Sequence, residues 1–250
     1  MSTNASFIYY RAKDLSKNLN DESIEEILGI NQWTIDTEIN GIAYKNYFQI
    51  PNTLSFALRT TYPGLIIGSG YNHPTGEKDS DNASDFQLGF YFDHTTGMPI
   101  IPGSTVKGVL KSVFPKKCEP GEVKSEKIKY INQTLHKDEF INESNWETLF
   151  DKEDVFFDAY ISGIPFDSDK IFAEDYVTPH KDQFKDPVPI RFLKIAPGIV
   201  FCFQFKLNDS CIENTQKITK KEKLDLFKQI LLDFGIGAKR NVGYGNLVKP

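Results

Sequence analysis

The residues with the most evident chemistry lie near the C-terminal end of the chain, where glycines and cations share one short stretch. Four glycines surround two cations and an amide: Gly235, Gly237, Gly243 and Gly245 around Lys239, Arg240 and Asn241. Glycine permits positive φ and a close approach of the backbone, and the cations supply charge. The stretch therefore predicts a loop that binds a polyanion. Taken alone, it also fits a glycine-rich turn between a helix and a strand with incidental charges.

The residues before this glycine loop predict a helix that holds it in place. Thr219 and Glu222 have the spacing of a capping box, which indicates where a helix begins. Apolar residues then recur at helical spacing and predict one buried face: Leu224, Phe227, Ile230, Leu231 and Phe234. Gly235 follows at the position of a left-handed cap.

A second cationic stretch precedes Pro115, which is expected to end a helix. Ser104 is the candidate N-cap of this helix. Lys107 and Lys111 are like charges at i,i+4, and Gly108 between them costs about 1 kcal/mol relative to alanine. Such a face indicates a close anionic partner. A solvated lysine face, with the glycine admitted by tight helix packing, is the alternative.

The start of the same helix and several turns hold further candidate ligands. Ser104 and Thr105 combine hydroxyl groups with the positive end of the helix dipole, which suits a phosphate. His73, His94 and His180 lie in stretches that are typical of exposed turns, and they are lesser candidates for binding phosphate.

Composition restricts what such cationic surfaces can do. Of the 250 residues, 40% are hydrophobic and 13% are aromatic, which is enough for a sizeable core. The 34 acidic and 29 basic residues give a net charge of −5. A negative net charge disfavours a free-standing, non-specific nucleic-acid binder, so any contact with nucleic acid must be local.

The cysteines and the length of the apolar runs indicate the cellular compartment of the protein. Cys118, Cys202 and Cys211 lack CxxC spacing, and the N-terminus has no basic region followed by an apolar one. No apolar run approaches membrane-spanning length. We therefore expect a cytoplasmic protein without disulfides, cofactor or metal site, in which Cys202 lies in a strand.

The order of the expected elements predicts the fold class. A long, kinked strand from Leu54 to Ile67 precedes the Lys107 helix, and a strand over Val155–Ile161 follows, with Phe156, Asp158 and Tyr160 on one side. Ala196-Pro-Gly198 then predicts a hairpin of Ile190–Ile195 with Ile199–Leu207. The capped helix and a strand at Asn246–Lys249 complete a β-α-β-β-α-β order. We expect an α+β, ferredoxin-like (RRM-like) fold with helical and loop insertions.

The expected domain organisation is simple. Residues 1–50, with a short helix at Ser23–Leu28, form an N-terminal extension packing on the core. Residues 51–250 form a single domain. A charged, helix-like insertion occupies about residues 116–150, and its aromatic end is expected to dock on the body of the protein or on a neighbour.

Several motifs resemble the RAMP superfamily of CRISPR RNA-binding proteins. They are the Ile101-Pro-Gly-Ser-Thr-Val-Lys-Gly-Val-Leu-Lys-Ser stretch, Phe157-Asp-Ala-Tyr, and the closing Gly235-x-Gly-x5-Gly243-x-Gly245. Tyr62-Pro-Gly-Leu-Ile-Ile-Gly-Ser-Gly-Tyr-Asn-His73 and Thr178-Pro-His180 resemble the family of sixth RAMP subunits of type III-B (Cmr) effector complexes. The resemblance runs from about Ser55 to the C-terminus.

The resemblance implies a ferredoxin-like, non-catalytic subunit that caps the backbone filament near the 3′ end of a CRISPR guide RNA. Its implied partners are the guide RNA, the guide–target duplex and other RAMP subunits. The residues expected to bind RNA are Ser104, Thr105, Lys107, Lys111, Gly235, Gly237, Lys239, Arg240, Asn241, Gly243, Gly245 and His94.

Two other functions stay open from the sequence. Some RAMP relatives are endoribonucleases that use a histidine base or a loop aspartate, so His94, His180, Asp93 and Asp158 are possible catalytic groups. Either aspartate is also explained as a hydrogen-bonded structural carboxylate. No HExxH, Walker or GxSxG motif is present. The third possibility is a structural subunit whose glycine loop contacts only protein.

Overall fold

The computed structural model describes residues 50–67, 90–93, 95–137, 140–164, 170–177, 190–213 and 216–250, together with the backbone of 38–39 and 42–43. The two short strands β1 (Glu38–Ile39) and β2 (Ile42–Ala43) pair with each other. The helix expected at Ser23–Leu28 lies outside the described residues, as do His73, His94 and His180.

The main sheet has the strand order of a ferredoxin-like fold. Four of its strands are β3 (Leu54–Thr60), β7 (Ala159–Gly163), β10 (Val200–Lys206) and β13 (Leu247–Val248). They lie in the order β13-β3-β10-β7, and every neighbouring pair is antiparallel. Numbered by their place in the β-α-β-β-α-β unit, this order is 4-1-3-2. The expected α+β, ferredoxin-like fold is therefore confirmed.

The sheet extends beyond β7 and is irregular beside it. β5 (Pro99–Ile101) pairs with β7, β4 (Tyr91–Phe92) pairs with β5, and the short β6 (Val155–Phe156) pairs with β10. Asp93 closes the turn between β4 and β5, because its Oδ2 atom accepts from the amides of Thr95 (3.1 Å) and Thr96 (2.6 Å).

The strand expected over Val155–Ile161 is interrupted by a bulge. Phe156 lies opposite Phe205 and Tyr160 opposite Cys202, so four steps on this strand match three on β10. One extra residue reverses the alternation of side chains. Phe156 therefore lies on the same side as the buried Ile161, and the expected placement of Phe156 with Tyr160 is wrong.

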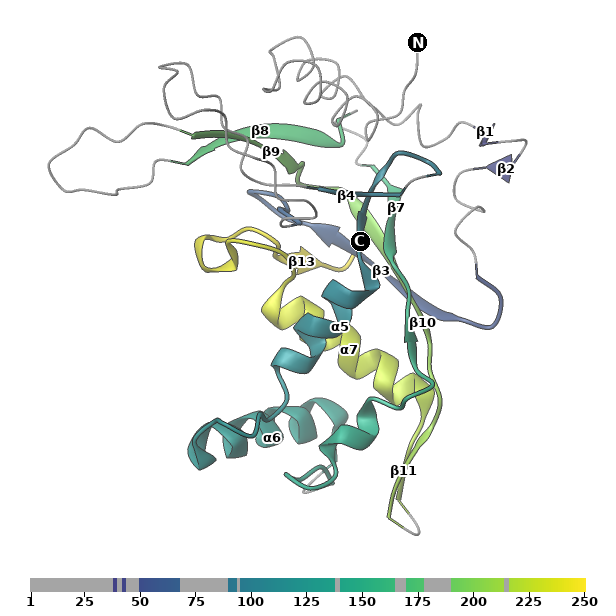
Figure 1. The fold of residues 1–250 in the computed structure, drawn as a ribbon, viewed down its shortest axis with the longest axis vertical. Helices are drawn as coiled ribbons and strands as arrows, with labels where there is room; N and C mark the ends of the chain where they lie inside the picture. Colours follow the sequence, from purple (N-terminus) through teal and green to yellow (C-terminus); the bar gives the residue numbers. More distant parts are fainter. Residues whose placement is uncertain are drawn as a thin grey trace, which may run out of the picture.

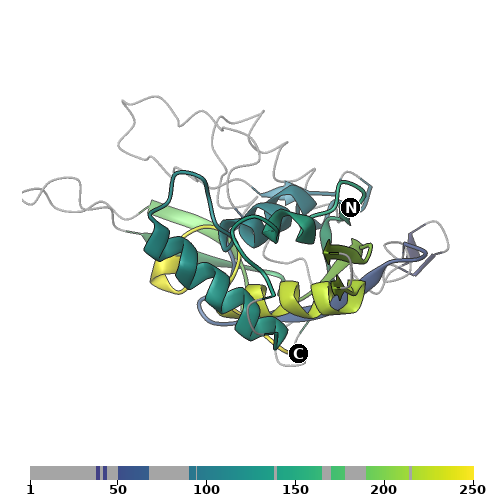
Figure 2. The ribbon, with the colours of Figure 1, turned by 90° about the horizontal axis from the view of Figure 1, so that it is seen from below.

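Two helices cover one face of the sheet, and a third packs beside them. α5 (Gly103–Ser112) and α7 (Lys220–Phe234) contact each other, and α7 also contacts β3 and β13. α6 (Gly121–Leu135) packs against α7. Figures 1 and 2 show the three helices together on one side of the strands.

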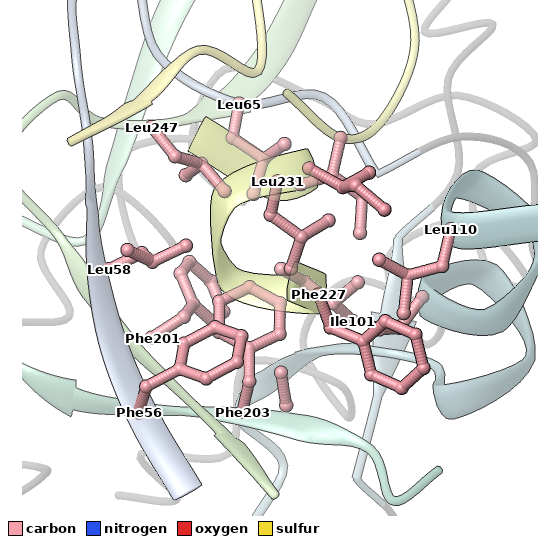
Figure 3. Packing of buried hydrophobic residues seen from close by; sticks show 14 of the residues in the cluster. Phe56, Leu58, Leu65, Ile101, Leu110, Phe201, Phe203, Phe227, Leu231 and Leu247 are labelled. Carbon is pink, nitrogen blue, oxygen red and sulfur yellow. The ribbon is translucent and has the colours of Figure 1, made fainter. Parts of the chain in front are cut away.

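The core between the helices and the sheet is largely aromatic. The alternation expected from Ile199 to Leu207 is confirmed for its five apolar side chains, which are all buried, although Gln204 between two of them is buried as well. Phe203 and Phe205 of β10 stack on Phe56 of β3 with ring centroids 5.4 Å apart, and Phe227 of α7 packs against Phe205. Figure 3 shows strand and helix side chains meeting in this layer. Burial of this apolar area is the main source of stability.

The aromatic end of the 116–150 segment docks on the body of the protein. η1 (Trp146–Leu149) places Trp146 on Phe114 at 5.6 Å, and Phe150 lies 4.8 Å from Phe114 and 5.5 Å from Phe227. A continuous row of rings thus connects this segment to the core. Next to η1, β11 (Ser210–Glu213) and β12 (Gln216–Ile218) form a small hairpin.

α7 begins as expected and buries Phe227, Ile230 and Leu231 as predicted, but the edges of its buried face differ from the prediction. The capping box of Thr219 and Glu222 is present in full. Lys223 and Leu226 are buried instead of Leu224 and Phe234, and Phe234 is 42% exposed. The Phe234 ring packs edge-on against Tyr130 of α6, so the apolar residue missing from the core contacts the third helix. Lys223 is accommodated because its ammonium group lies 2.8 Å from Asp154.

Two strand predictions around Leu65 and Ile195 are wrong. β3 ends at Thr60, and Leu65 forms only an isolated bridge to Ile195, so there is no single strand from Leu54 to Ile67. β9 (Ile190–Ile195) pairs with β8 (Phe172–Val177) and not with β10. The Ala196-Pro-Gly198 turn instead carries the chain from this two-stranded sheet into the main sheet. The Gly198 amide fixes the crossing by donating to the Thr60 carbonyl at 2.8 Å.

Within the described part of the chain, every helix is too short or too polar to cross a lipid bilayer. Cys202 lies in β10, as expected, and all three cysteines are free thiols. Histidine, cysteine and carboxylate side chains do not gather into a potential metal site anywhere in the described ranges.

Candidate nucleic-acid interface

The first turn of α5 is capped by Asp158, which lies between β6 and β7. The helix begins at Gly103, and Pro102 is the N-cap, without a side-chain cap bond. The Gly103 amide donates to Oδ1 of Asp158 at 2.7 Å. Ser104 is thus not the N-cap, because Asp158 supplies the acceptor that Ser104 was expected to provide. A carboxylate at this position already occupies part of the positive end of the helix.

Lys107 and Lys111 lie over aromatic rings of their own chain. The Lys107 ammonium is 5.0 Å from the centroid of the Phe156 ring, and the Lys111 ammonium is 5.3 Å from that of Phe150. Cation–π contacts of this kind contribute about 0.5–1 kcal/mol at exposed sites. They explain how two like charges are tolerated on one face without an external anion. Within the described residues neither lysine is paired with a carboxylate.

Gly108 is not required by packing inside the chain. No described atom lies within 4 Å of a Cβ placed there, and the residue is exposed. The alternative that tight intramolecular packing admits this glycine is therefore wrong. Ser104, Lys107, Gly108 and Lys111 lie on one side of α5 at spacings of three and four residues, and they form a cationic face.

Lys111 also borders a pocket whose charged lining residues are mainly acidic. Its volume is about 780 Å³, and Trp146, Phe150, Asp209 and Ser210 are among its lining residues. The lining carries four carboxylates and two lysines, so it suits a polyanion less well than the outer face of α5.

All four glycines of the glycine loop adopt positive φ, as their pattern predicted. The angles are 64° at Gly235, 96° at Gly237, 96° at Gly243 and 75° at Gly245. A Cβ at Gly245 would lie 1.8 Å from a backbone oxygen, whereas one at Gly243 would have space. Gly235 has ψ near −172°, so its cap is not of the left-handed helical type.

Most backbone amides of the glycine loop form hydrogen bonds within the chain and are not available to a ligand. The amides of Gly235, Gly243 and Gly245 donate to the carbonyls of Leu231, Arg240 and Gly64. The Ile236 amide donates to Gly245 and the Ala238 amide to Ile66, which ties the loop to the segment after β3. The side chains, and not an open row of amides, are therefore the groups available for a polyanion.

The tip of the loop exposes the predicted polar side chains. It forms a short 3-10 turn, η2 (Arg240–Val242), preceded by Lys239 in the left-handed conformation with φ of 55°. Arg240 and Asn241 are exposed, and Lys239 is half-buried. The Arg240 guanidinium also donates to the Phe234 carbonyl at 3.1 Å. This bond stabilises the C-terminal end of α7, because a cation lies at the negative end of the helix dipole.

A charged network behind the loop was not found by sequence reasoning. Lys194 and the Tyr244 hydroxyl both donate to Oδ2 of Asp175 at 2.5 Å. Burial raises the pKa of the Asp175 carboxyl, but the hydrogen bonds from Lys194, Tyr244 and the Tyr176 amide, with the charge of Lys194, together lower it below its usual value. Burial and the bond to Asp175 raise the pKa of the Tyr244 phenol. The network joins β8 and β9 to the loop, and Tyr244 between two glycines was its only signal in the sequence.

The two cationic surfaces are connected through α7. The glycine loop continues from its C-terminal end, and α5 packs along its side. Figure 1 shows the loop beside the end of β3 and close to the paired strands β8 and β9. His94 lies outside the described residues, so its place relative to these surfaces stays a prediction.

Fold and surface together define an RRM-like α+β protein with a helix-borne cationic face and a structured glycine loop. The model of the RAMP superfamily matches residues 57–248, which is well over half of the chain. The chain therefore belongs to the RAMP superfamily, as the sequence motifs predicted.

One curated relative is similar along almost the whole chain. It is the CRISPR system CMR subunit Cmr6 of Saccharolobus solfataricus, which is 25% identical over 246 residues, covering 94% of this chain and 73% of that protein. The expected resemblance to the sixth RAMP subunits of Cmr complexes is thereby confirmed.

Two solved structures are also similar. A chain of the type III-B Cmr-beta complex bound to cognate target RNA is 21% identical, with a TM-score of 0.46, covering 96% of this chain and 70% of that one. Cmr6 from Pyrococcus furiosus is 22% identical, with a TM-score of 0.45, covering 79% of this chain and 98% of that one.

Proposed function

We propose that this chain is a non-catalytic, guide RNA-binding subunit of a type III-B (Cmr) RNA-guided antiviral effector complex in the cytoplasm. The similarity to a Cmr6 subunit over 94% of the chain carries this proposal. The subunit would cap the backbone filament at the 3′ end of the guide RNA and contact other RAMP subunits on its remaining faces.

RNA phosphates would bind at two places on the helix-bearing side. One is the outer face of α5, where Lys107 and Lys111 are held in position by Phe156 and Phe150. The other is the tip of the glycine loop, where Arg240 and Asn241 are exposed. Arginine and lysine contacts to phosphates supply affinity without reading sequence, as suits a protein that must accept many guides.

The net charge of −5 fits a subunit that completes a groove with partners. Two local cationic surfaces on an acidic protein attract RNA weakly when the protein is alone. We therefore expect the isolated chain to bind single-stranded RNA weakly and with a strong dependence on salt.

A protein-interaction subunit without RNA contact is the second candidate, and one observation favours it. The amides of three loop glycines donate hydrogen bonds to carbonyl groups of the same chain. Both lysines of α5 lie over aromatic rings of the same chain. Neither surface therefore requires an external anion to be stable. No comparable observation favours the endoribonuclease alternative, and the Asp158 carboxylate accepts the Gly103 amide.

Crosslinking within the assembled complex tests the proposal. The complex is purified through a tag on this chain and irradiated, and the crosslinked peptides and RNA are identified. We expect guide RNA attached to peptides from the glycine loop or α5, with crosslinks near the 3′ end of the guide. Crosslinks from other subunits only, in a complex that contains this chain, would support the protein-interaction candidate.

A further inference from the structure

Tyr62 is the most exposed large hydrophobic side chain in the described part of the protein. It lies in the turn after β3 and is 84% exposed. Single exposed aromatic residues are common and need no explanation by themselves. Tyr62 differs from such residues in its surroundings, which fix its position next to the glycine loop.

The backbone on both sides of Tyr62 is fixed to the base of the glycine loop. The Thr61 amide donates to the Asn246 carbonyl at 3.1 Å, and the Gly245 amide donates to the Gly64 carbonyl at 2.8 Å. A Cβ at Gly243 would lie 3.5 Å from Cδ of Pro63, so the two segments are in contact. Tyr62 is thus held on a support that it shares with the loop.

A fixed cation lies near the tyrosine ring. The Lys194 ammonium is 5.9 Å from the centroid of the Tyr62 ring and 5.7 Å from that of Tyr244. Lys194 is itself buried, and its ammonium group lies 2.5 Å from the Asp175 carboxylate, so its position beside the Tyr62 ring is fixed. The ring is therefore positioned from below while most of its surface remains accessible to solvent.

The exposed groups of the glycine loop, which contacts the segment that carries Tyr62, suit RNA better than the centre of a protein interface. Arg240 and Asn241 are exposed at the tip of the same loop, and Lys239 precedes them. Protein interfaces are depleted of charge at their centres, whereas proteins that bind single strands combine cations for the backbone with aromatic rings for the bases. Tyr62 supplies the aromatic ring, and Lys239 and Arg240 at the loop tip supply the cations.

We propose that Tyr62 is a stacking platform for an unpaired base of the RNA strand whose phosphates contact Lys239 and Arg240. This inference rests on the proposed function. Stacking on a tyrosine accepts any base, because every base has a π face, so the platform would hold a guide nucleotide without selecting its sequence.

The test uses the full-length protein and a fluorescent single-stranded RNA of mixed sequence, at about 50 mM and about 200 mM salt. Tyr62→Ala should weaken binding roughly tenfold at both salt concentrations, because stacking on one base is lost while phosphate contacts remain. Tyr62→Trp should bind as the wild type does. Arg240→Glu should weaken binding and also flatten the salt dependence, which distinguishes a phosphate contact from a stacking contact.

Tyr176→Ala is the matched control, since Tyr176 is also an exposed tyrosine but lies on β8, and it should change nothing. Wild-type affinity in Tyr62→Ala, together with a loss in Arg240→Glu, would overturn the platform and leave the proposed function intact. Loss of a partner subunit from the complex, with unchanged RNA affinity, would likewise overturn it in favour of a protein contact. Absence of RNA binding by the wild-type protein at low salt would count against the proposed function itself.

Discussion

The Gly103 amide donates a 2.7 Å hydrogen bond to the Asp158 carboxylate, so the residue at the bulge between β6 and β7 caps the first turn of α5. A Cβ at Gly103 would lie 2.0 Å from the Phe156 carbonyl oxygen, which shows how closely the helix start approaches the strand. The position of the cationic face of α5 therefore depends on this contact.

Asp158→Ala should lower the free energy of unfolding by about 1–2 kcal/mol, because a helix N-terminal amide loses its acceptor. Urea denaturation measures the change. Glu153→Ala, at an exposed position in the preceding turn, is the control and should stay within about 0.5 kcal/mol of the wild type.

The same variant separates a structural aspartate from a catalytic one. In an assembled complex, Asp158→Ala should leave target RNA cleavage within a few-fold of normal. A loss of about a hundredfold with assembly intact, the size expected for removal of a general base, would make this subunit an enzyme.

Lys223 and Asp154 form a fully buried ion pair, with an Nζ–Oδ2 distance of 2.8 Å and both side chains 0% exposed. Asp154 also accepts from the Asn208 amide at 2.8 Å. Lys223→Met should destabilise the protein by about 3–5 kcal/mol, because it leaves a carboxylate buried without its counter-charge.

Adding Asp154→Asn to Lys223→Met should recover part of that loss, since the uncompensated charge is removed. Lys221→Met is the control, because Lys221 is exposed on the same helix. A loss below about 1 kcal/mol in Lys223→Met would show that the pair is not desolvated as described.

Two glycines with space for a side chain should respond in opposite directions. Gly108→Ala should stabilise the isolated protein by about 0.5–1 kcal/mol, because Gly108 lies inside a helix and a Cβ there touches nothing described. Gly243→Ala should destabilise it by about 1–2 kcal/mol, although its Cβ also has space, because φ is 96°.

Thermal unfolding of both variants tests the assignment of backbone conformation. If Gly243→Ala proved neutral, the positive φ at the loop would be in doubt. If Gly108→Ala proved destabilising, the helix face would be packed against something in the isolated chain.

Much of the main sheet and of α7 was predictable, because the signals there are local. The alternation from Ile199 to Leu207 and the capping box at Thr219 need only the residues beside them. The positive φ of the loop glycines follows from the same kind of local rule.

The errors arose where distant segments decide the outcome. The one-residue bulge at β6 and β7 leaves the strand pattern intact but reverses its faces. The pairing of β9 with β8 instead of β10 depends on where the chain leaves the sheet. The rings below Lys107 and Lys111 come from residues about forty to fifty positions away, so the local pattern could not predict the contacts that hold the two lysines.

Glu222 gives the protein a specific pH dependence. Its hydrogen bond to Lys137, with the one from the Thr219 amide, lowers the pKa of the Glu222 carboxyl from 4.5 to about 2. A depressed carboxyl pKa stabilises the fold above the unfolded-state value. The contribution should therefore be complete above about pH 4.5 and decline as the pH falls toward 2.

Glu222→Gln keeps the capping geometry but removes the charge. Because the Glu222 side chain is partly exposed, the variant should lose no more than about 1 kcal/mol at neutral pH, and the difference should vanish near the low end of that range. Glu126→Gln on the exposed side of α6 is the control and should show no such convergence. The measurement is urea denaturation across the pH range.

In the proposed function, α5 and the glycine loop hold guide RNA. The most direct test of this role is the amount of guide RNA recovered per purified complex, at two salt concentrations, for two charge-reversal variants. They are Lys107→Glu with Lys111→Glu, and Lys239→Glu with Arg240→Glu. Both should lower recovery at both salt concentrations and reduce its dependence on salt, because fewer phosphate contacts remain. The stability of the isolated subunit should change little. Unchanged recovery with normal salt dependence in both variants would contradict the RNA-binding account and support the protein-interaction subunit.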